Sequence, residues 1–223
     1  MTITYHADVV QGSDEWVAMR RGLITASEMN LILTPTLKVA ANDKSRAHIY
    51  ELAAQRISQY FEPHYISDDM LRGREEEILA RTLYAEKYYA VQDVGFVTND
   101  DHGFTIGYSP DGLVGDDGLI ECKSRRQKYQ VQTIIENVLP DEYMLQVQTG
   151  LLVTGRKWLD FVSYSGGLPM AVIRVMPDPV IHAAILDAAR KAEADITAKI
   201  AAYKLASATL VPTERKVEQE MVV

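Results

Sequence analysis

Cysteine is almost absent from this sequence, since Cys122 is the single one among 223 residues. One cysteine excludes an internal disulfide framework, a four-cysteine zinc site and a cysteine-held iron–sulfur cluster. The five histidines have no spacing typical of zinc ligands, which also disfavours a histidine metal site. A chain with one cysteine is compatible with a reducing cytoplasm.

Long apolar runs are also missing. No stretch approaches the roughly 20 apolar residues that a membrane span requires. Residues 1–10 carry acidic and polar side chains and lack the apolar run of a signal peptide. We therefore expect a soluble cytoplasmic protein with no membrane partner.

Positive charge is in the minority, because 23 Lys and Arg residues stand against 31 Asp and Glu, for a formal net charge of −8. This balance excludes a general polycation that coats nucleic acid, but it permits a nuclease whose basic groups gather in one cleft. The hydrophobic and charged fractions, 47% and 24%, are ordinary for a globular protein, and the length fits one large domain. We expect that domain to cover residues 1–211 and a flexible polar tail to cover 212–223.

Apolar residues at helical spacing predict several helices. The predicted helices cover residues 42–61, 69–89 and 141–153, with a last one after Pro179 and an early one capped by Ser13 or Asp14. In the helix over 69–89, the predicted apolar face consists of Ile78, Leu79, Leu83 and Tyr84.

Short segments rich in β-formers predict the sheet. Residues 94–99, 104–109 and 119–123 are separated by Asn, Asp and Gly turns, which is typical of an antiparallel meander. Two more strands are predicted over 158–164 and 170–175. The expected fold class is therefore α/β or α+β, with a central mixed β-sheet flanked by helices.

One predicted hairpin carries the candidate chemistry. Asp111 and Glu121 flank a turn over 115–118, so folding the hairpin brings their carboxylates to neighbouring rungs. Because successive side chains of a strand alternate between faces, Glu121 and Lys123 point the same way and Cys122 points the opposite way. Two carboxylates suit Mg²⁺ or Mn²⁺, which lowers the pKa of bound water, and a lysine can orient or deprotonate that water. This set is typical of phosphodiester hydrolysis.

A solvated hairpin with a surface Glu and Lys is the alternative, and for the bare spacing it is the commoner case. The surrounding residues favour a nuclease. Ser-Pro-Asp-Gly over 109–112 precedes the turn, a β-type run leads into Glu121, and a basic run follows over 123–128. We therefore take metal-dependent nucleic-acid cleavage as the leading interpretation.

An ordered set of motifs resembles the phage lambda-type 5′→3′ exonucleases, the viral recombinase branch of the PD-(D/E)XK nucleases. The motifs are Gln-Gly-Ser-Asp-Glu-Trp (11–16), Arg20 with Gly-Leu-Ile-Thr-Ala-Ser (22–27), Arg-Gly-Arg-Glu-Glu-Glu (72–77), Ser-Pro-Asp-Gly (109–112), Glu-Cys-Lys (121–123) and Tyr-Met-Leu-Gln-Val-Gln (143–148). Each motif is weak alone, and the ordered set over about residues 11–165 is specific. The resemblance implies a restriction-endonuclease-like PD-(D/E)XK core.

The resemblance also implies a metal site. Asp111 and Glu121 would hold Mg²⁺, with two ions per site and Mn²⁺ as a substitute, and the main-chain carbonyl of Cys122 would be a further ligand. Family members often carry an aliphatic residue at the position of Cys122. A main-chain ligand tolerates that change of side chain.

Further catalytic roles follow from the same resemblance. Lys123 would position or activate the attacking water, and Gln146 would assist it from a neighbouring helix. Glu77 would help to hold or orient the second metal. Tyr143 lies one helical turn from Gln146, so both can face the site.

A pocket for the terminal 5′-phosphate is implied at Arg20, Ser27 and Ser109, because an arginine fork and two hydroxyls match phosphate oxygens. Where family members often carry an aromatic residue, this chain has Arg72, which can meet the DNA backbone. Arg125 is a further predicted DNA contact.

The resemblance implies a homotrimeric ring around linear double-stranded DNA with a 5′-phosphate end. An acidic outer wall would reconcile the net charge with DNA binding, and basic residues would line the inside. The implied partner is a single-strand annealing protein that loads onto the 3′ overhang during phage recombination. The implied setting is the cytoplasm of a bacterial host, with the gene carried by a phage or prophage.

Two alternatives remain open. The first is an endonuclease on the same core, which would cut a covalently closed circular duplex. The second is a DNA-end-binding recombination scaffold without turnover, against which the intact Asp111, Glu121 and Lys123 speak.

Overall fold

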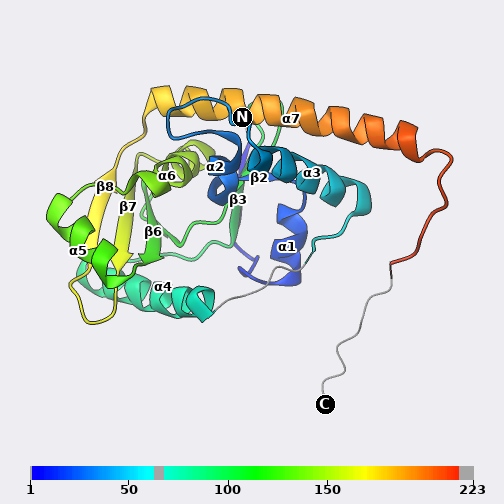
Figure 1. The fold of residues 1–223 in the computed structure, drawn as a ribbon. Coiled ribbons are helices and arrows are strands. Elements are labelled where there is room, and N and C mark those ends of the chain that lie inside the picture. Colours follow the sequence, from blue (N-terminus) through cyan, green and yellow to red (C-terminus); the bar gives the residue numbers. More distant parts are fainter. Residues whose placement is uncertain (1, 63–67, 216–223) are drawn as a thin grey trace, which may run out of the picture.

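The computed structural model describes residues 2–62 and 68–215 of the chain. Helices surround two β-sheets (Figure 1). The elements in chain order are β1 (Ile3–His6), α1 (Asp14–Arg20), β2 (Ile24–Thr25), η1 (Ala26–Glu28), α2 (Met29–Ile32), α3 (Asp43–Ser58), α4 (Asp68–Lys87), β3 (Phe96–Asn99), β4 (Ile106–Tyr108), β5 (Gly112–Val114), β6 (Gly118–Ser124), α5 (Gln127–Glu136), α6 (Asp141–Thr154), β7 (Trp158–Tyr164), β8 (Ala171–Val175) and α7 (Pro179–Ser207).

Both sheets have four strands, in the orders β1-β3-β4-β2 and β5-β6-β7-β8. In the second sheet β6 and β7 run parallel, whereas β5–β6 and β7–β8 are antiparallel pairs. The sheet is therefore mixed, and helices flank it, which confirms the predicted fold class.

The predicted three-stranded meander is wrong in one respect. β3 and β4 do pair in the first sheet, but the chain then crosses to the second sheet between Tyr108 and Gly112. Pro110 lies in this crossing, and because proline has no backbone N–H, it cannot continue a ladder. The crossing places Asp111 where the two sheets meet.

Local signals set the helix ends. Ser13 Oγ accepts a hydrogen bond from Trp16 N at 3.2 Å and caps α1, as predicted. The Asp178 side chain accepts hydrogen bonds from two backbone N–H groups and caps the start of α7. Pro179 follows it in the first turn of the helix, where its missing N–H costs nothing. α6 ends before Gly155, whose φ of 65° suits glycine.

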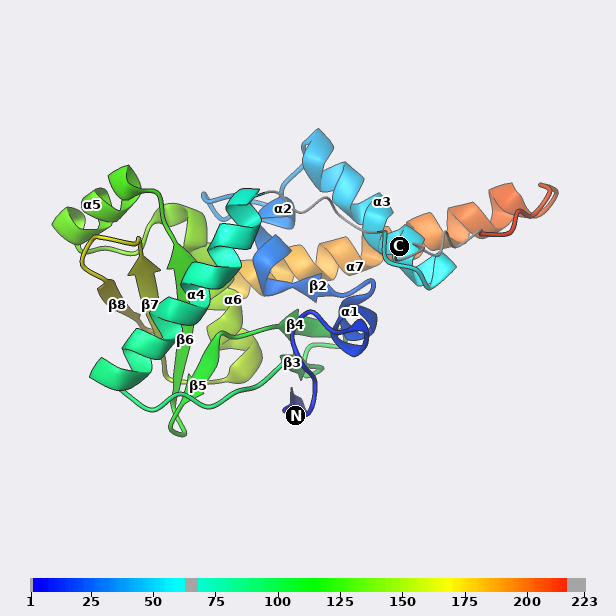
Figure 2. The same cartoon turned by 90° about the horizontal axis from the view of Figure 1, so that it is seen from below.

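Two hydrophobic clusters sit on either face of the second sheet. Leu119 of β6 belongs to the larger one, which α6 and α7 cover, while Ile120 and Cys122 belong to the smaller one beneath α4. Figure 2 shows α4 lying across this sheet. The alternation sends Glu121 and Lys123 toward α6 and away from Cys122.

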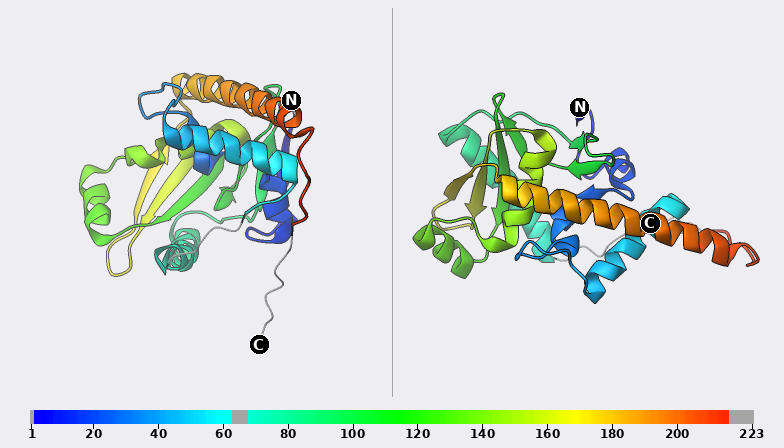
Figure 3. Two further views of the ribbon diagram at one scale, coloured as in Figure 1. Left: turned by 45° about the vertical axis from the view of Figure 1, so that its right-hand side comes forward. Right: turned by 90° about the horizontal axis from the view of Figure 1, so that it is seen from above.

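The outer helices are arranged around this core. α3 and α7 lie side by side (Figures 1 and 3). The helix predicted after Pro179 is confirmed, and α7 buries one apolar stripe formed by Ile185, Ala188, Ala189, Ala192 and Ile196.

The apolar face predicted for the helix over 69–89 is partly wrong. Tyr84 is buried, but Ile78 is 67% exposed and Leu79 is exposed as well. α4 packs on the sheet through Ala80 and Tyr84, which lie one turn apart on the same helix face. The small Ala80 side chain lets the helix approach the sheet closely, and the larger Ile78 and Leu79 face outward.

α5 was not predicted, because its buried residues are polar. Gln130 Nε2 donates to the carbonyls of Ser163 and Pro169 at 3.0 and 2.7 Å, and this anchors the helix without an apolar stripe. Within 2–62 and 68–215, no helix is long and apolar enough to cross a membrane. The predicted domain end at 211 stays a prediction, and residues 216–223 of the predicted tail lie outside the described residues.

Candidate active site

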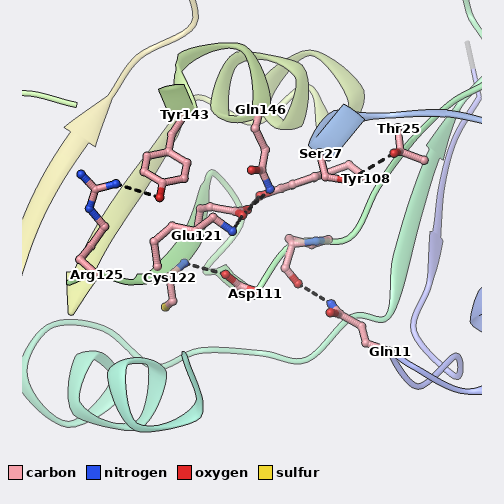
Figure 4. Close-up of polar contacts among 12 residues, drawn as sticks. Gln11, Thr25, Ser27, Tyr108, Asp111, Glu121, Cys122, Arg125, Tyr143 and Gln146 are labelled. Atoms are coloured by element: carbon pink, nitrogen blue, oxygen red, sulfur yellow. Dashed lines mark hydrogen bonds and ion pairs between the residues drawn. The ribbon is translucent and has the colours of Figure 1, made fainter. Parts of the chain in front are cut away.

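The β5–β6 hairpin brings Asp111 and Glu121 together. Gly112 pairs with Ile120, so Asp111 stands opposite Glu121 at the next rung. Asp111 Oδ2 accepts a hydrogen bond from Cys122 N at 2.6 Å (Figure 4). The structure thus places both carboxylates at one end of the hairpin, as the sequence predicts.

Glu121 is buried, with 2% of its surface exposed. Three donors hold its carboxylate: Tyr108 Oη at 2.7 Å on Oε2, and Gln146 Nε2 at 2.5 Å and Lys123 Nζ at 2.6 Å on Oε1. Gln146 reaches down from α6, as Figure 4 shows. The structure therefore joins Glu121, Lys123 and Gln146 in one cluster.

Negative charge is in excess in this cluster. Burial and the charge of Glu121 raise the pKa of Asp111 to about 8, and burial also raises the pKa of Glu77. Burial opposes the charged form of Lys123, yet attraction to Glu121, Asp111 and Glu77 lifts its pKa above the usual range. Repulsion between the carboxylates persists at Asp111 despite the nearby Lys123 ammonium, so a divalent cation would relieve it.

The oxygen atoms available here suit a hard cation. In an extended strand, the N–H and C=O of one residue point to the same edge. The N–H of Cys122 points at Asp111, so its carbonyl opens beside that carboxylate, while its side chain is buried beneath α4. Within the described part of the chain, no group of three or more His, Cys, Asp or Glu side chains has metal-binding geometry. Two carboxylates, one carbonyl and water are a donor set that Mg²⁺ accepts.

A second cluster holds the residues of the predicted phosphate pocket. The Arg20 guanidinium lies 4.4 Å from the centroid of the Trp16 ring, and its Nη2 is 3.4 Å from Ser27 Oγ. Trp16 Nε1 donates to Ser109 Oγ at 2.8 Å. Arg20, Ser27 and Ser109 are therefore gathered near Trp16. Ser109 lies two residues before Asp111 in the chain, which connects this cluster to the carboxylates.

The two remaining predicted DNA contacts, Arg125 and Arg72, lie outside both clusters. Arg125 has a side chain only 6% exposed, forms an ion pair with Glu142 and donates to Tyr143 Oη at 2.8 Å. Its charge is thus already compensated, and Tyr143 is fixed by this bond and by the Phe161 ring at 5.1 Å. Arg72 is exposed on α4.

Three residues of the site were given no individual role from the sequence, although Gln11 and Trp16 belong to one of the quoted motifs. Tyr108 binds Glu121, and Gln11 Nε2 donates to the carbonyl of Pro110 at 2.8 Å beside Asp111. Trp16 is half-buried, and its ring lies against the Arg20 guanidinium. A tyrosine in a strand of small and apolar residues is one signal, because a buried hydroxyl needs a partner.

Comparisons with known proteins find one matching sequence family and several similar structures. Residues 15–157 match the sequence family described as the YqaJ-like viral recombinase domain. The structure resembles an alkaline exonuclease (LHK-Exo) from Laribacter hongkongensis, with 33% identity, a TM-score of 0.78, and coverage of 89% of this chain and 100% of that one. The same exonuclease in complex with dAMP gives 34% identity, a TM-score of 0.79 and the same coverage.

A phage related exonuclease from Haemophilus somnus 129PT shares the fold at 15% identity, with a TM-score of 0.55 and coverage of 81% of this chain and 96% of that one. No curated protein sequence matches this chain.

Proposed function

The chain belongs to the family of YqaJ-like viral recombinase domains, and on this basis we propose that it is a Mg²⁺-dependent exonuclease. It degrades the 5′ strand of linear double-stranded DNA and leaves a 3′ single-stranded overhang. The likeness to an alkaline exonuclease along that protein's whole length supports a nuclease. The observation that carries the proposal is the junction of Asp111, Glu121 and Lys123 on one hairpin.

Hydrolysis of the phosphodiester is assigned to this junction. Asp111, Glu121 and the Cys122 carbonyl would hold Mg²⁺, which when bound would lower the pKa of a bound water and offset charge on the phosphate oxygens. Lys123 keeps its proton beside Glu121, so its ammonium is suited to orient the attacking water and to donate to the phosphate. Gln146 holds Glu121 from α6.

End recognition is assigned to Arg20, Ser27 and Ser109. A guanidinium and two hydroxyls bind a terminal phosphate more strongly than a terminal hydroxyl, because the hydrogen bonds are charge-assisted. The Trp16 ring packs against the Arg20 guanidinium, and its indole N–H donates a hydrogen bond to the Ser109 hydroxyl. We expect this cluster to favour 5′-phosphorylated ends.

The proposal extends to assembly and setting. α5 exposes Val131 and Ile135, of which Ile135 is 77% exposed, and Val138 just after the helix is exposed as well. An unpartnered apolar face of this kind supports self-association, and the family resemblance favours a ring of three chains. The proposed partner is a single-strand annealing protein, and the proposed setting is the cytoplasm of a bacterial host that carries the phage or prophage gene.

The test uses linear duplexes labelled at the 5′ or 3′ end, and a covalently closed circular duplex, each with Mg²⁺ or with EDTA. We expect Mg²⁺-dependent release of labelled mononucleotides from the 5′ end, an intact opposite strand and an intact circle. Cutting of the circle would favour an endonuclease. Binding of ends without nucleotide release would favour a scaffold.

A further inference from the structure

Tyr108 connects the two sheets at the active site. It is the last residue of β4 in the first sheet, and its hydroxyl reaches Glu121 of β6 in the second sheet at 2.7 Å. The ring is almost fully buried, with 2% exposed. Figure 4 shows it lying between the start of the hairpin and α6.

The two oxygens of Glu121 have different partners. Lys123 and Gln146 both bind Oε1, whereas among the described residues only Tyr108 donates to Oε2. The terminal torsion of a glutamate is broad, so bonds to one oxygen alone leave the carboxylate plane free to turn. The Tyr108 hydroxyl therefore fixes that plane.

Space for the ring comes from α6. A Cβ atom on Gly150 would lie 2.7 Å from Tyr108 Cζ, so any other residue there would displace the ring. Gly150 lies one turn after Gln146 and shares its helix face. One face of α6 thus supplies Gln146, which donates to Glu121 Oε1, and Gly150, which leaves space for the Tyr108 ring that donates to Oε2.

We propose that Tyr108 is a positioning residue of the active site, which fixes the Glu121 carboxylate through Oε2 and thereby tightens binding of the divalent cation. This inference rests on the proposed function. A phenol with the ordinary pKa of about 10 keeps its proton at neutral pH, so the hydroxyl can act as the donor to Oε2. Residues that hydrogen-bond metal ligands in this way typically change metal affinity by about 10–100-fold.

The protein contains a matched control. Tyr84 of α4 is also buried, and its hydroxyl donates to Asp160 Oδ2 at 2.6 Å. Asp160 of β7 is the neighbour of Ile120 of β6, so its side chain lies on the face of the sheet that α4 covers. Glu121 lies on the other face. Each Tyr→Phe change removes one hydroxyl bound to a buried carboxylate, but only Tyr108 touches the metal site.

The experiment compares wild type, Tyr108→Phe and Tyr84→Phe in three measurements. These are thermal unfolding in EDTA, Ca²⁺ binding by calorimetry without DNA, and the Mg²⁺ concentration that gives half-maximal nucleotide release. We expect both variants to lose a similar amount of stability. Only Tyr108→Phe should weaken Ca²⁺ binding and raise the Mg²⁺ requirement, by about 10–100-fold. Gly150→Ala, which keeps the hydroxyl but displaces the ring, should weaken Ca²⁺ binding too.

The outcomes distinguish failure of the Tyr108 inference from failure of the proposed function. If wild type binds Ca²⁺ and releases nucleotides while Tyr108→Phe and Gly150→Ala bind Ca²⁺ within twofold of it, Tyr108 is structural only and the inference is overturned. If wild type neither binds the ion nor releases nucleotides with Mg²⁺, the proposed function falls, and the inference with it.

Discussion

The Asp111 carboxylate accepts a hydrogen bond from the main-chain N–H of Cys122 at 2.6 Å, across the two strands of one hairpin. This bond ties the entry of β5 to the middle of β6 and sets Asp111 beside the Cys122 carbonyl. Because the Cys122 side chain is buried on the opposite face, the backbone alone serves the site. A conservative change such as Cys122→Val should therefore leave the site's geometry intact.

Loss of Lys123 should remove cleavage and leave DNA binding in place. Lys123→Gln keeps a hydrogen-bond donor near Glu121 but removes the ammonium, so we expect turnover to fall by about 10²–10⁴-fold. Single-turnover nucleotide release measures the rate, and fluorescence anisotropy with Ca²⁺ measures DNA affinity. Lys157→Gln is the control, because Lys157 pairs with Asp117 at an exposed position. Equal loss of rate in both variants would remove Lys123 from catalysis.

Asp111 makes the stability of the metal-free protein depend on pH. Its pKa is raised from 3.8 to about 8 in the folded state, so the folded protein binds this proton more tightly than the unfolded chain. The stabilising contribution is complete below pH 4 and is lost as the pH rises through 8. Relative to wild type, Asp111→Asn should gain stability over this window, at most about 1.4 kcal/mol per pH unit.

Urea unfolding in EDTA at pH 6 and pH 8 tests this expectation, with the difference between variant and wild type as the readout. A difference that stays constant between the two pH values would show that Asp111 is already ionised at pH 6.

Divalent cations should stabilise the folded protein. A cation relieves the repulsion between Asp111, Glu121 and Glu77, and at 100 times its dissociation constant a ligand adds about 2.7 kcal/mol. Thermal unfolding with Mg²⁺ or Ca²⁺ should therefore shift upward, and Glu121→Gln should abolish most of the shift. Glu142→Gln, which alters a carboxylate bound to Arg125, should keep it.

End preference should depend on Arg20. Removing the guanidinium in Arg20→Ala costs hydrogen bonds to a charged group, each worth about 1.5–3 kcal/mol, so the ratio of kcat/KM for 5′-phosphate over 5′-hydroxyl ends should fall at least about tenfold. Trp16→Phe loses the bond to Ser109 and should lower the ratio less. Arg190→Ala, at an exposed ion pair, should not change it. An unaltered ratio in Arg20→Ala would place end recognition elsewhere.

The hairpin could be predicted because its information is local. Turn residues between Asp111 and Glu121 set the register, and strand alternation separates Lys123 from Cys122. The cap at Ser13 is equally local. These features depend on residues a few positions apart, and the structure places them as the sequence indicates.

The remainder depends on packing between distant segments. Trp16 and Ser109 are 93 positions apart, and nothing in either neighbourhood reveals that they meet. Tyr108 reaches Glu121 only because the chain changes sheets after β4. The ion pair between Arg125 and Glu142 also joins separate elements, because Glu142 lies in the first turn of α6.

The most direct test of the central claim is diffraction at the manganese edge from crystals soaked in MnCl₂. We predict an anomalous peak within bonding distance of Asp111, Glu121 and the Cys122 carbonyl oxygen. If the same solution supports nucleotide release while the peak lies elsewhere, or the pair of carboxylates stays without a bound ion, the site is not the metal centre.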